Sequence, residues 1–459
     1  MDIGLVGLGS MGLNLAKNLI SKNFKVNAFE KNNKIVDVVS LKNISGLQLN
    51  KTLSQLCNNL SSPKIIMLSL PANKIDDCIE ELIKYLNPND IIADLGNSLY
   101  LKSIDRHLYL SKYKIDFLGI GVSGGPRGAK LGPAIMAGGS KKAWDKVENI
   151  FNSIASKKNN NTACCYFGSS GSGHFVKLIH NGIEYALMEA LAEITSTLMN
   201  AFNLSQNDQS KEFKNIESTS SSSFLLEITS QILNAQSEDN QYFIDQVDYK
   251  IGQNGTGKWT VNAALDFGVS IPSIYAAVSN RSSSNNFNYH INTKKNNENK
   301  NQKYKINEIN LEEIIFFNFA CSLYQGISVI YASNKLEDFN FNIKDIFKAW
   351  SSGCILQGEY LDHISLEYNL TDNFNLDFLY NLINKKIPDN LLSVRNFVSI
   401  ATKTGNPTPV LSANLSYYDS IFSNHKIGET IQLQRSFFGL HPLKDKQTDK
   451  VIKPYWTKS

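Results

Sequence analysis

A glycine loop close to the N-terminus places the strongest constraint on the fold of this chain. The residues Gly7-Leu8-Gly9-Ser10-Met11-Gly12 follow a short apolar run and lead into a helical pattern, Met11–Ser21. This strand–turn–helix order with G-x-G-x-x-G spacing is typical of a Rossmann unit, in which backbone N–H groups approach a pyrophosphate at a helix N-terminus. We therefore predict that this loop binds a dinucleotide.

Short apolar runs and amphipathic helical patterns alternate over the first 170 residues. The runs expected to form strands are Ile3–Leu8, Lys25–Phe29, Lys64–Leu70, Ile91–Asp94 and Phe117–Val122. Such alternation predicts an α/β Rossmann domain with a doubly wound, mostly parallel sheet. Helical periods follow with few strand signals, which predicts a large all-α domain. We expect a dinucleotide-binding domain over 1–170, an all-helical domain over 171–423 and a C-terminal tail over 424–459.

Charge and composition exclude several classes of protein. The 459 residues carry 46 Lys and Arg against 42 Asp and Glu, a net charge of +4, so we expect no nucleic-acid partner. Six scattered cysteines without CxxC spacing predict free thiols and no metal site, and the adjacent Cys164 and Cys165 are expected to pack in a strand. No apolar run approaches ~20 residues, and the strand pattern beginning at Ile3 leaves no room for a leader, so we expect a cytoplasmic protein without a membrane segment.

The end of the second predicted strand bears on the choice of cofactor. It reads Phe29-Glu30-Lys31-Asn32. An acid at this distance from the glycine loop holds a ribose 2′-hydroxyl, which favours NAD, whereas the neighbouring Lys31 can hold a 2′-phosphate, which favours NADP. The residues themselves leave the choice open and lean slightly to NAD through Glu30.

A polar stripe marks the first long helical pattern of the second domain. Its residues follow an i, i+3, i+4, i+7, i+8 spacing on one arc of about 140°: Lys177, His180, Asn181, Glu184 and Tyr185. A solvated helix face is the commonest explanation of such a stripe. The other positions are apolar, however, and buried charges need a functional reason. A buried Lys can accept a hydroxyl proton as hydride leaves, and a Glu with a raised pKa can return a proton to carbon.

Three further segments offer groups for anions. Ser123-Gly124-Gly125 follows a strand and presents backbone N–H groups for a carboxylate, although a structural turn explains it equally well. The loop ending in Lys258-Trp259-Thr260 resembles a Walker A loop, but Trp259 stands where a Mg²⁺-binding hydroxyl is required, so we expect phosphate donors and no NTPase. In the tail, Arg435 suits bidentate phosphate binding, although a surface Arg is the simpler explanation.

Taken in order, these segments resemble the 6-phosphogluconate dehydrogenase family over essentially the whole chain. The most specific parts are Lys177-Leu-Ile-His-Asn-Gly-Ile-Glu-Tyr185 and Gly255-Thr-Gly-Lys-Trp-Thr260. The resemblance implies a helical substrate and dimerisation domain, and a tail that reaches the partner subunit of a homodimer. It also implies NADP-dependent oxidation of a phosphorylated sugar acid at C3, then β-decarboxylation to ribulose 5-phosphate and CO₂, in the oxidative branch of the pentose phosphate pathway and without a metal.

The resemblance assigns a role to each site residue. Lys177 corresponds to the general base for the C3 hydroxyl, and Glu184 to the acid that protonates the enediol at C1. The substrate-binding residues it implies are Asn97, Ser123, Gly124, Gly125, His180, Asn181, Tyr185, Lys258, Thr260 and Arg281, with Arg435 and His441 supplied by the other subunit's tail. The cofactor-binding residues are expected to be Gly7, Leu8, Gly9, Ser10, Met11, Gly12, Glu30, Lys31, Asn32, Ser69, Leu70, Pro71 and Asn97.

The chain departs from the family pattern at several positions. Glu30-Lys31-Asn32 replaces an Asn-Arg-Thr that grips the 2′-phosphate, so we hypothesise that NADP is used with reduced discrimination over NAD. Other departures are Leu99 and Pro126 for Glu, Ser351 for Arg and Ser436 for Asp.

Two alternatives remain open. A smaller-substrate β-hydroxyacid dehydrogenase is suggested by Ser69-Leu70-Pro71, but those chains are shorter and lack the Gly255–Thr260 loop and the Arg-bearing tail. A catalytically weak dimeric paralogue is opposed by the intact Lys177 and Glu184.

Overall fold

The computed structural model describes residues 2–41, 43–159, 161–253, 255–286, 304–334, 339, 341–371 and 373–457. The chain forms two compact units, Met1–Asn414 and Leu415–Ser459. The first unit contains both the sheet and most of the helices. The predicted divisions at 170 and 423 stay predictions.

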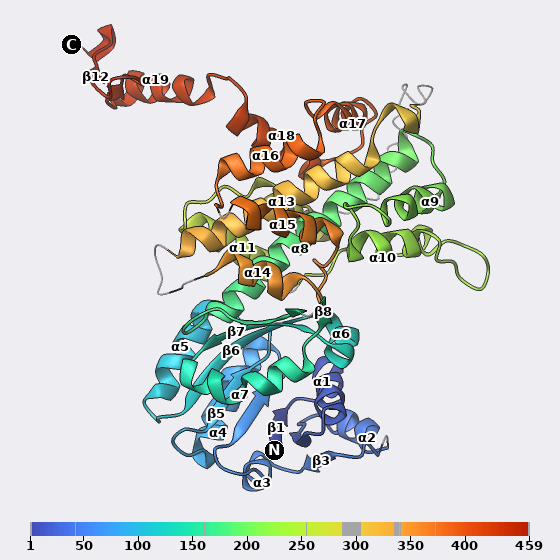
Figure 1. The fold of residues 1–459 in the computed structure, drawn as a ribbon, viewed down its shortest axis with the longest axis vertical. Helices are drawn as coiled ribbons and strands as arrows, with labels where there is room; N and C mark the ends of the chain where they lie inside the picture. The colour runs from blue at the N-terminus through green and yellow to red at the C-terminus, as the bar shows by residue number, and fades with distance from the viewer. Residues whose placement is uncertain are drawn as a thin grey trace. The chain divides into compact units, whose positions relative to one another are not determined.

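An eight-stranded sheet forms the N-terminal part of the first unit (Figure 1). Its strands are β1 (Asp2–Val6), β2 (Lys25–Phe29), β3 (Leu47–Asn50), β4 (Ile65–Leu68), β5 (Ile91–Asp94), β6 (Asp116–Ser123), β7 (Ala134–Gly139) and β10 (Cys164–Tyr166). They lie in the order β10-β7-β6-β5-β4-β1-β2-β3, and all neighbours are parallel except β6 and β7. The run 3-2-1-4-5-6 is the doubly wound order of dinucleotide-binding domains. The predicted fold class is therefore confirmed, although β3 and β7 were not predicted and β10 was expected only from Cys164 and Cys165.

Helices cover both faces of this sheet. They are α1 (Ser10–Ser21), α2 (Asn33–Leu41), α3 (Leu53–Asn58), η1 (Ala72–Lys74), α4 (Ile75–Leu82), η2 (Ile83–Tyr85), α5 (Tyr100–Ser111), α6 (Gly125–Leu131) and α7 (Lys141–Ile154). The packing of strand β4 explains why its sequence is continuously apolar. Ile65 and Met67 belong to one hydrophobic cluster, and Ile66 and Leu68 belong to another on the opposite face. Because both faces are buried, no polar residue alternates along the strand.

Two long helices form the centre of the helical part, as Figure 1 shows. Both α8 (Ser172–Asn200) and α13 (Leu311–Ser333) are buried on nearly every side. In the described part of the chain α13 is the one helix long and apolar enough to cross a membrane, and 89% of its apolar window is buried inside the protein. The sequence prediction had not singled it out. A helix apolar all round is typical of a core position in a large domain.

Shorter helices and small strand pairs complete the chain. Around α8 and α13 lie α9 (Gln206–Ile216), α10 (Phe224–Leu233), η3 (Phe243–Asp245), α11 (Thr256–Asp266), α12 (Pro272–Asn286), η4 (Ile306–Glu308), α14 (Ile343–Trp350), α15 (Glu359–Thr371), α16 (Leu376–Lys386) and α17 (Leu392–Lys403). A short antiparallel pair, β8 (Lys157–Lys158) with β9 (Asn161–Thr162), precedes β10. Helix α18 (Pro409–Phe422) spans the boundary between the two units.

The second unit contains a helix with exposed apolar side chains. After α18 it comprises α19 (Ile427–Gly439), β11 (Leu443–Lys444), β12 (Val451–Ile452) and η5 (Tyr455–Thr457). Phe437 and Phe438 of α19 are 62% and 77% exposed, and Ile427 is 61% exposed. Within the unit the Trp456 indole donates to Ser436 Oγ at 3.3 Å. Large exposed aromatic side chains on one helix are typical of an interaction surface.

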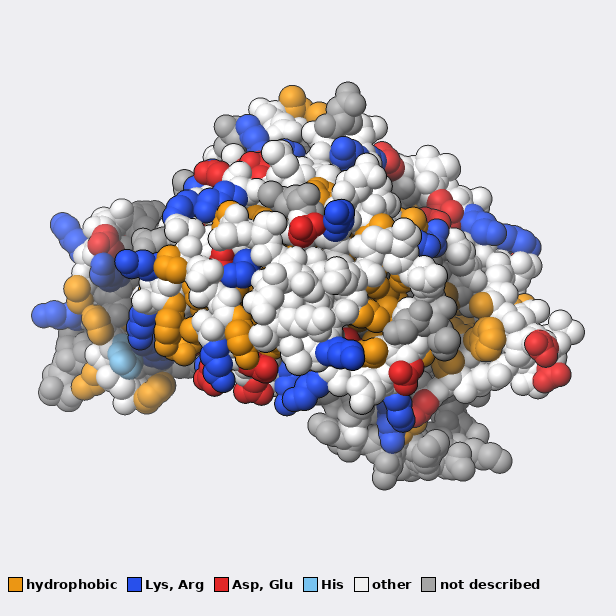
Figure 2. All heavy atoms as spheres, turned by 90° about the horizontal axis from the view of Figure 1, so that it is seen from below, with side chains coloured by type: hydrophobic (Ala, Val, Ile, Leu, Met, Phe, Trp, Pro, Cys, Tyr) orange, Lys and Arg blue, Asp and Glu red, His pale blue; other side chains and the backbone are white. Residues whose placement is uncertain are grey.

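The surface carries mixed charges, and the cysteines lie in the interior. On the face that Figure 2 shows, Lys and Arg side chains are interspersed with Asp, Glu and hydrophobic side chains. All six cysteines are free and buried. Cys164 and Cys165 lie in β10, which confirms that they pack in a strand. Burial raises the pKa of the Cys165 thiol to about 12, so this group is an unreactive packing element.

Candidate active site

The three glycines of the N-terminal loop have different structural tasks. A Cβ on Gly7, whose φ is 95°, would lie 2.4 Å from the Ser69 carbonyl oxygen, and a Cβ on Gly12 would lie 2.0 Å from the Gly7 carbonyl oxygen. A Cβ on Gly9 would meet no protein atom within 4 Å, and no side chain caps α1 there. The first and third glycines therefore permit close packing, and Gly9 leaves open space before the first N–H groups of α1. This arrangement fits the pyrophosphate of a dinucleotide.

A cavity of about 590 Å³ adjoins the glycine loop. Its lining includes six of the predicted cofactor residues: Gly7, Glu30, Lys31, Asn32, Leu70 and Pro71. The Glu30 carboxylate accepts hydrogen bonds from the Leu8 N–H at 2.7 Å and the Asn32 N–H at 2.9 Å. Both Glu30 oxygens thus bind backbone of the cofactor site itself. Lys74 of η1, which the sequence analysis missed, adds a second cation beside Lys31.

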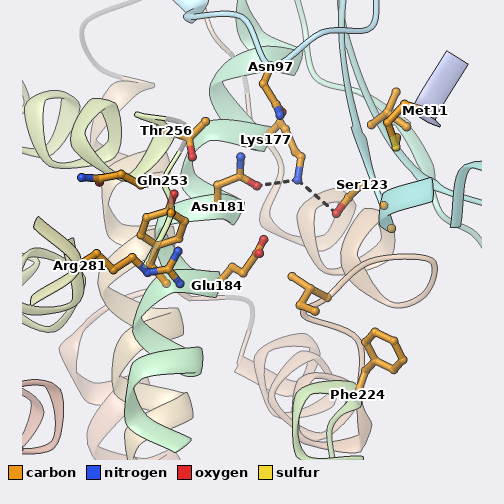
Figure 3. Close-up of a pocket in the computed structure, with 16 residues that line it drawn as sticks. Met11, Asn97, Ser123, Lys177, Asn181, Glu184, Phe224, Gln253, Thr256 and Arg281 are labelled. Atoms are coloured by element: carbon orange, nitrogen blue, oxygen red, sulfur yellow. Dashed lines mark hydrogen bonds between the residues drawn. The ribbon is translucent and has the colours of Figure 1, made fainter. Parts of the chain in front are cut away.

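A second cavity, of about 440 Å³, lies where the carboxyl edge of the sheet meets α8 (Figure 3). It brings together ten of the predicted residues: Met11, Asn97, Ser123, Gly124, Gly125, Lys177, Asn181, Glu184, Tyr185 and Arg281. The lining residues that were not predicted are Val122, Phe224, Gly252, Gln253, Thr256 and Ile355. Phe224 and Ile355 lie in segments without a chemical motif, so only the tertiary fold places them here.

Lys177 is the centre of a hydrogen-bond network inside this cavity. Its Nζ donates to Asn181 Oδ1 at 2.6 Å and to Ser123 Oγ at 3.2 Å (Figure 3). The side chain is 7% exposed, and burial lowers its pKa, while the Glu184 carboxylate opposes this change. A lysine with a lowered pKa can reach the neutral form that accepts a proton.

His180 lies behind Lys177 and does not line the cavity. Its ring is fully buried, 3.3 Å from Ser123 Oγ through Nε2 and 3.3 Å from Lys177 Nζ through Nδ1. Burial and the Lys177 charge lower the His180 pKa well below its ordinary value. The Glu184 carboxylate lies 3.9 Å from His180 Nδ1. His180 is therefore a neutral group that orients Lys177 and Ser123.

Glu184 and Arg281 supply the remaining charges of the cavity. Burial raises the pKa of the Glu184 carboxyl, and the Lys177 and Arg281 charges oppose this shift. Arg281, from α12, stacks its guanidinium 3.5 Å from the centre of the Tyr185 ring and is 7% exposed. Across the described ranges Arg281 has no carboxylate within 4.0 Å. A buried cation without an anionic partner is suited to an anionic ligand.

Other predicted phosphate ligands lie outside the cavity lining. The Thr260 hydroxyl donates to the Leu178 carbonyl at 2.8 Å, and a Cβ on Gly182 would lie 2.4 Å from Thr260 Cγ2. Thr260 thus packs α11 closely against α8, and Lys258 is exposed. Thr256, one turn earlier on α11, lines the cavity instead. The binding roles of Lys258 and Thr260 stay predictions.

The remaining predicted residues are placed as follows. Arg435 and His441 belong to the second unit, where both are exposed, and their roles also stay predictions. Ser69 donates its N–H to the Val6 carbonyl at 2.8 Å, so it links β4 to β1 directly beside Gly7. Leu8 and Ser10 complete the glycine loop at the start of α1.

The fold and the cavity together define a nicotinamide-dependent dehydrogenase of anionic hydroxy compounds. A dinucleotide loop contributes Met11 to a cavity that also holds a buried lysine, a carboxyl with raised pKa and an arginine that has no carboxylate partner among the described residues. Comparison with known proteins refines this class.

The chain matches two protein-family models. These are "NAD binding domain of 6-phosphogluconate dehydrogenase" over residues 2–168 and "6-phosphogluconate dehydrogenase, C-terminal domain" over residues 173–456. Proteins named 6-phosphogluconate dehydrogenase, decarboxylating, from Staphylococcus epidermidis and Staphylococcus aureus are 32% identical, with 99% of each chain covered. The structure of Plasmodium falciparum 6-phosphogluconate dehydrogenase is similar with a TM-score of 0.87 and 29% identity, covering 99% of this chain and 100% of that one. The chain belongs to the 6-phosphogluconate dehydrogenase family, as the resemblance predicted.

Proposed function

We propose that this protein oxidises and decarboxylates 6-phosphogluconate with NADP⁺, giving ribulose 5-phosphate, CO₂ and NADPH. The observation that carries the proposal is the buried Lys177 amine, which shares one cavity with Glu184 and Arg281 beside the dinucleotide loop. The staphylococcal relatives are named as the decarboxylating enzyme, and the Plasmodium protein was solved with NADP⁺ and with 6-phosphogluconate.

The reaction needs one group that works first as base and then as acid. The neutral Lys177 amine takes the proton of the C3 hydroxyl, and NADP⁺, when bound, accepts the C3 hydride. The resulting ammonium returns its proton to the C3 oxygen as the C1–C2 bond breaks, CO₂ leaves and the electron pair forms an enediol. Asn181 and Ser123 hold Lys177 Nζ at 2.6 and 3.2 Å through both steps. Because burial lowers the Lys177 pKa, the neutral amine that acts as base forms more readily than on an exposed lysine.

The last step returns a proton to carbon. Glu184 lies two helical turns from Lys177 on the same face of α8, and both side chains point into the same space in Figure 3. Burial raises the Glu184 pKa and so favours the protonated carboxyl, which can deliver a proton to C1 of the enediol, the carbon that was C2 of the substrate. As this C–H bond forms, the neighbouring enediol hydroxyl gives its proton back to the neutral Lys177 amine and becomes the ketone oxygen of ribulose 5-phosphate. The Glu184 carboxylate that remains is stabilised by the Lys177 ammonium and the Arg281 guanidinium.

Two ends of the cavity suit the two anionic ends of the substrate. Ser123, Gly124 and Gly125 mark the end nearer Lys177, where backbone N–H groups face a carboxylate. Arg281 and Tyr185 mark the other end, where a guanidinium binds phosphate oxygens in pairs. In this proposed pose, C3 would lie between the two ends, within reach of Lys177.

The proposed cofactor is NADP⁺. We expect weaker discrimination against NAD⁺ than an arginine guanidinium bound to the 2′-phosphate would give. Lys31 and Lys74 line the adenosine-side cavity and attract a 2′-phosphate. Glu30 repels the same group, but its carboxylate is held by the Leu8 and Asn32 N–H groups, which partly offset its charge. Asp77 and Glu81 line the same cavity, so the charges alone do not favour the 2′-phosphate. The preference for NADP⁺ is therefore proposed from the NADP⁺ complex of the similar Plasmodium enzyme.

The proposed assembly is a homodimer in which the tail of each subunit contributes Arg435 and His441 to the partner's site. The exposed Phe437 and Phe438 of α19 support it, because burying two aromatic rings on a partner stabilises association. The proposed location is the cytoplasm, where six unpaired cysteines stay reduced.

The direct test is formation of reduced nicotinamide from 6-phosphogluconate, with NADP⁺ and NAD⁺ measured side by side. We expect turnover with both and a higher kcat/KM with NADP⁺. Absence of turnover with either cofactor, in protein shown by calorimetry to bind it, would refute the proposed function. Turnover of 3-hydroxyisobutyrate in place of 6-phosphogluconate would favour the smaller-substrate alternative.

A further inference from the structure

A buried arginine outside both cavities joins its own helix to three other segments of the N-terminal domain. Arg106 of α5 is 5% exposed. Its Nε donates to Asp76 Oδ1 at 2.6 Å, and its Nη1 donates to Asp94 Oδ2 and to Ser98 Oγ, each at 2.9 Å. Its Nη2 reaches the Ala72 carbonyl at 3.4 Å. One rigid guanidinium therefore connects α5, the first turn of α4 and the segments that follow β4 and β5.

The segments after β4 and β5 carry predicted cofactor residues. Leu70 and Pro71 line the adenosine-side cavity, directly before Ala72. Asn97 lines the active-site cavity, directly before Ser98. The two loops are in close approach, because a Cβ on Gly96 would lie 2.9 Å from the Leu70 carbonyl oxygen.

The loop around Asn97 folds around one buried carboxylate. Asp94 is fully buried, accepts the Gly96 N–H at 2.9 Å through Oδ1, and accepts the Ser98 hydroxyl at 2.7 Å through Oδ2. A buried carboxylate is costly without a cation, and Arg106 supplies that cation at 2.9 Å. The conformation that presents Asn97 thus depends on Arg106.

We propose that Arg106 is a positioning residue for cofactor binding: through Asp94, Ser98 and Ala72 it holds the two loops after β4 and β5 at the spacing that NADP⁺ requires. Arg106 does not line either cavity among the residues described for them, so it acts through Asn97, Leu70 and Pro71. The identity of the cofactor rests on the proposed function.

The same two strands provide a matched control at their opposite ends. Lys64 and Asp90 directly precede β4 and β5, and their side chains pair at 3.3 Å with exposures of 10% and 0%. This pair is buried like Arg106–Asp94 but lies at the amino edge of the sheet, away from the cofactor loops. Lys64→Met and Arg106→Met therefore remove comparable interactions from the same strands.

The test measures the NADP⁺ dissociation constant by isothermal titration calorimetry, together with kcat and melting temperature, for wild type, Arg106→Lys, Arg106→Met and Lys64→Met. We expect Arg106→Met to weaken NADP⁺ binding at least about tenfold, with partial recovery in Arg106→Lys. Lys64→Met should lower the melting temperature but leave the dissociation constant within about twofold.

Equal dissociation constants for wild type and folded Arg106→Met would overturn the proposal, and so would equal shifts in Arg106→Met and Lys64→Met. If Arg106→Met does not fold, Ser98→Ala replaces it, and an unchanged NADP⁺ affinity in both Ser98→Ala and Arg106→Lys overturns the proposal. Because binding is measured without substrate, a wild type that binds NADP⁺ but does not turn over 6-phosphogluconate would refute the proposed function and leave this comparison valid.

Discussion

Gly9→Ala should separate cofactor binding from stability. The φ and ψ of Gly9 are −59° and −172°, which alanine adopts without strain, and its Cβ would meet no protein atom within 4 Å. Alanine at a helix N-cap costs about 0.5–1 kcal/mol, while replacing glycine stabilises by about 0.4–1 kcal/mol through the unfolded chain. These terms nearly cancel, so we expect the melting temperature to stay within about 1–2 °C of wild type.

The added methyl group of Gly9→Ala would occupy the space proposed for the pyrophosphate. We expect NADP⁺ binding, measured by calorimetry, to weaken at least about tenfold, or about 1.4 kcal/mol. Gly12→Ala is the contrasting variant, because its Cβ would lie 2.0 Å from the Gly7 carbonyl oxygen. It should lower the melting temperature by about 2–4 °C as well as weaken binding. Undiminished NADP⁺ affinity in Gly9→Ala would refute the assignment of the open space to the cofactor.

Further predictions concern the charged groups. Lys177→Met should reduce kcat at least about 10³-fold with NADP⁺ affinity nearly unchanged, as steady-state kinetics and calorimetry would show. Lys177 must be neutral to act as base, so kcat should fall as pH falls through the lowered Lys177 pKa. Glu184 must be protonated to act as acid, so kcat should also fall as pH rises through the raised Glu184 pKa. Glu184→Gln should remove this alkaline limb of the pH profile and lower kcat about 10²–10⁴-fold. The double variant Glu30→Asn, Lys31→Arg should raise the ratio of kcat/KM with NADP⁺ to kcat/KM with NAD⁺. An unchanged ratio would show that these two positions do not distinguish the ribose 2′-phosphate from the 2′-hydroxyl. Burial raises the pKa of Glu193 to about 8 although its carboxylate accepts the Val410 and Leu411 N–H groups. The stability that protonated Glu193 contributes is therefore present below the unfolded pKa and is lost as pH rises toward 8. The melting temperature of Glu193→Gln should accordingly rise relative to that of wild type between pH 5 and pH 8.

Local chemistry explains what the sequence could predict. The glycine loop and the polar face of α8 are defined by spacing within one segment, so Gly9, Lys177 and Glu184 were identified before the fold was known. Strand β2 was predicted with its observed bounds, because Val26, Ala28 and Phe29 form a short apolar stretch between Lys25 and Glu30. Strand β7, rich in glycine and alanine, lacks that signal, since its pairing with β6 depends on contacts across the sheet.

The positions of the remaining site residues depend on tertiary packing, which the sequence alone does not reveal. Thr260 carries a good phosphate donor, yet close contact with Gly182 directs its hydroxyl to a helix carbonyl. Thr256 lies one turn away on the same helix, and only the way α11 meets α8 places it at the cavity. Arg106 has no motif around it, because its partners come from three other segments.

The central claim is that the Lys177 cavity couples oxidation to decarboxylation. Its most direct test is the stoichiometry of NADPH, CO₂ and ribulose 5-phosphate formed from 6-phosphogluconate, measured by absorbance, trapped isotopic CO₂ and chromatography. We predict equimolar amounts of all three from wild type and none from Lys177→Met, which should still bind NADP⁺. NADPH formed without CO₂, or equimolar products from Lys177→Met, would contradict the account.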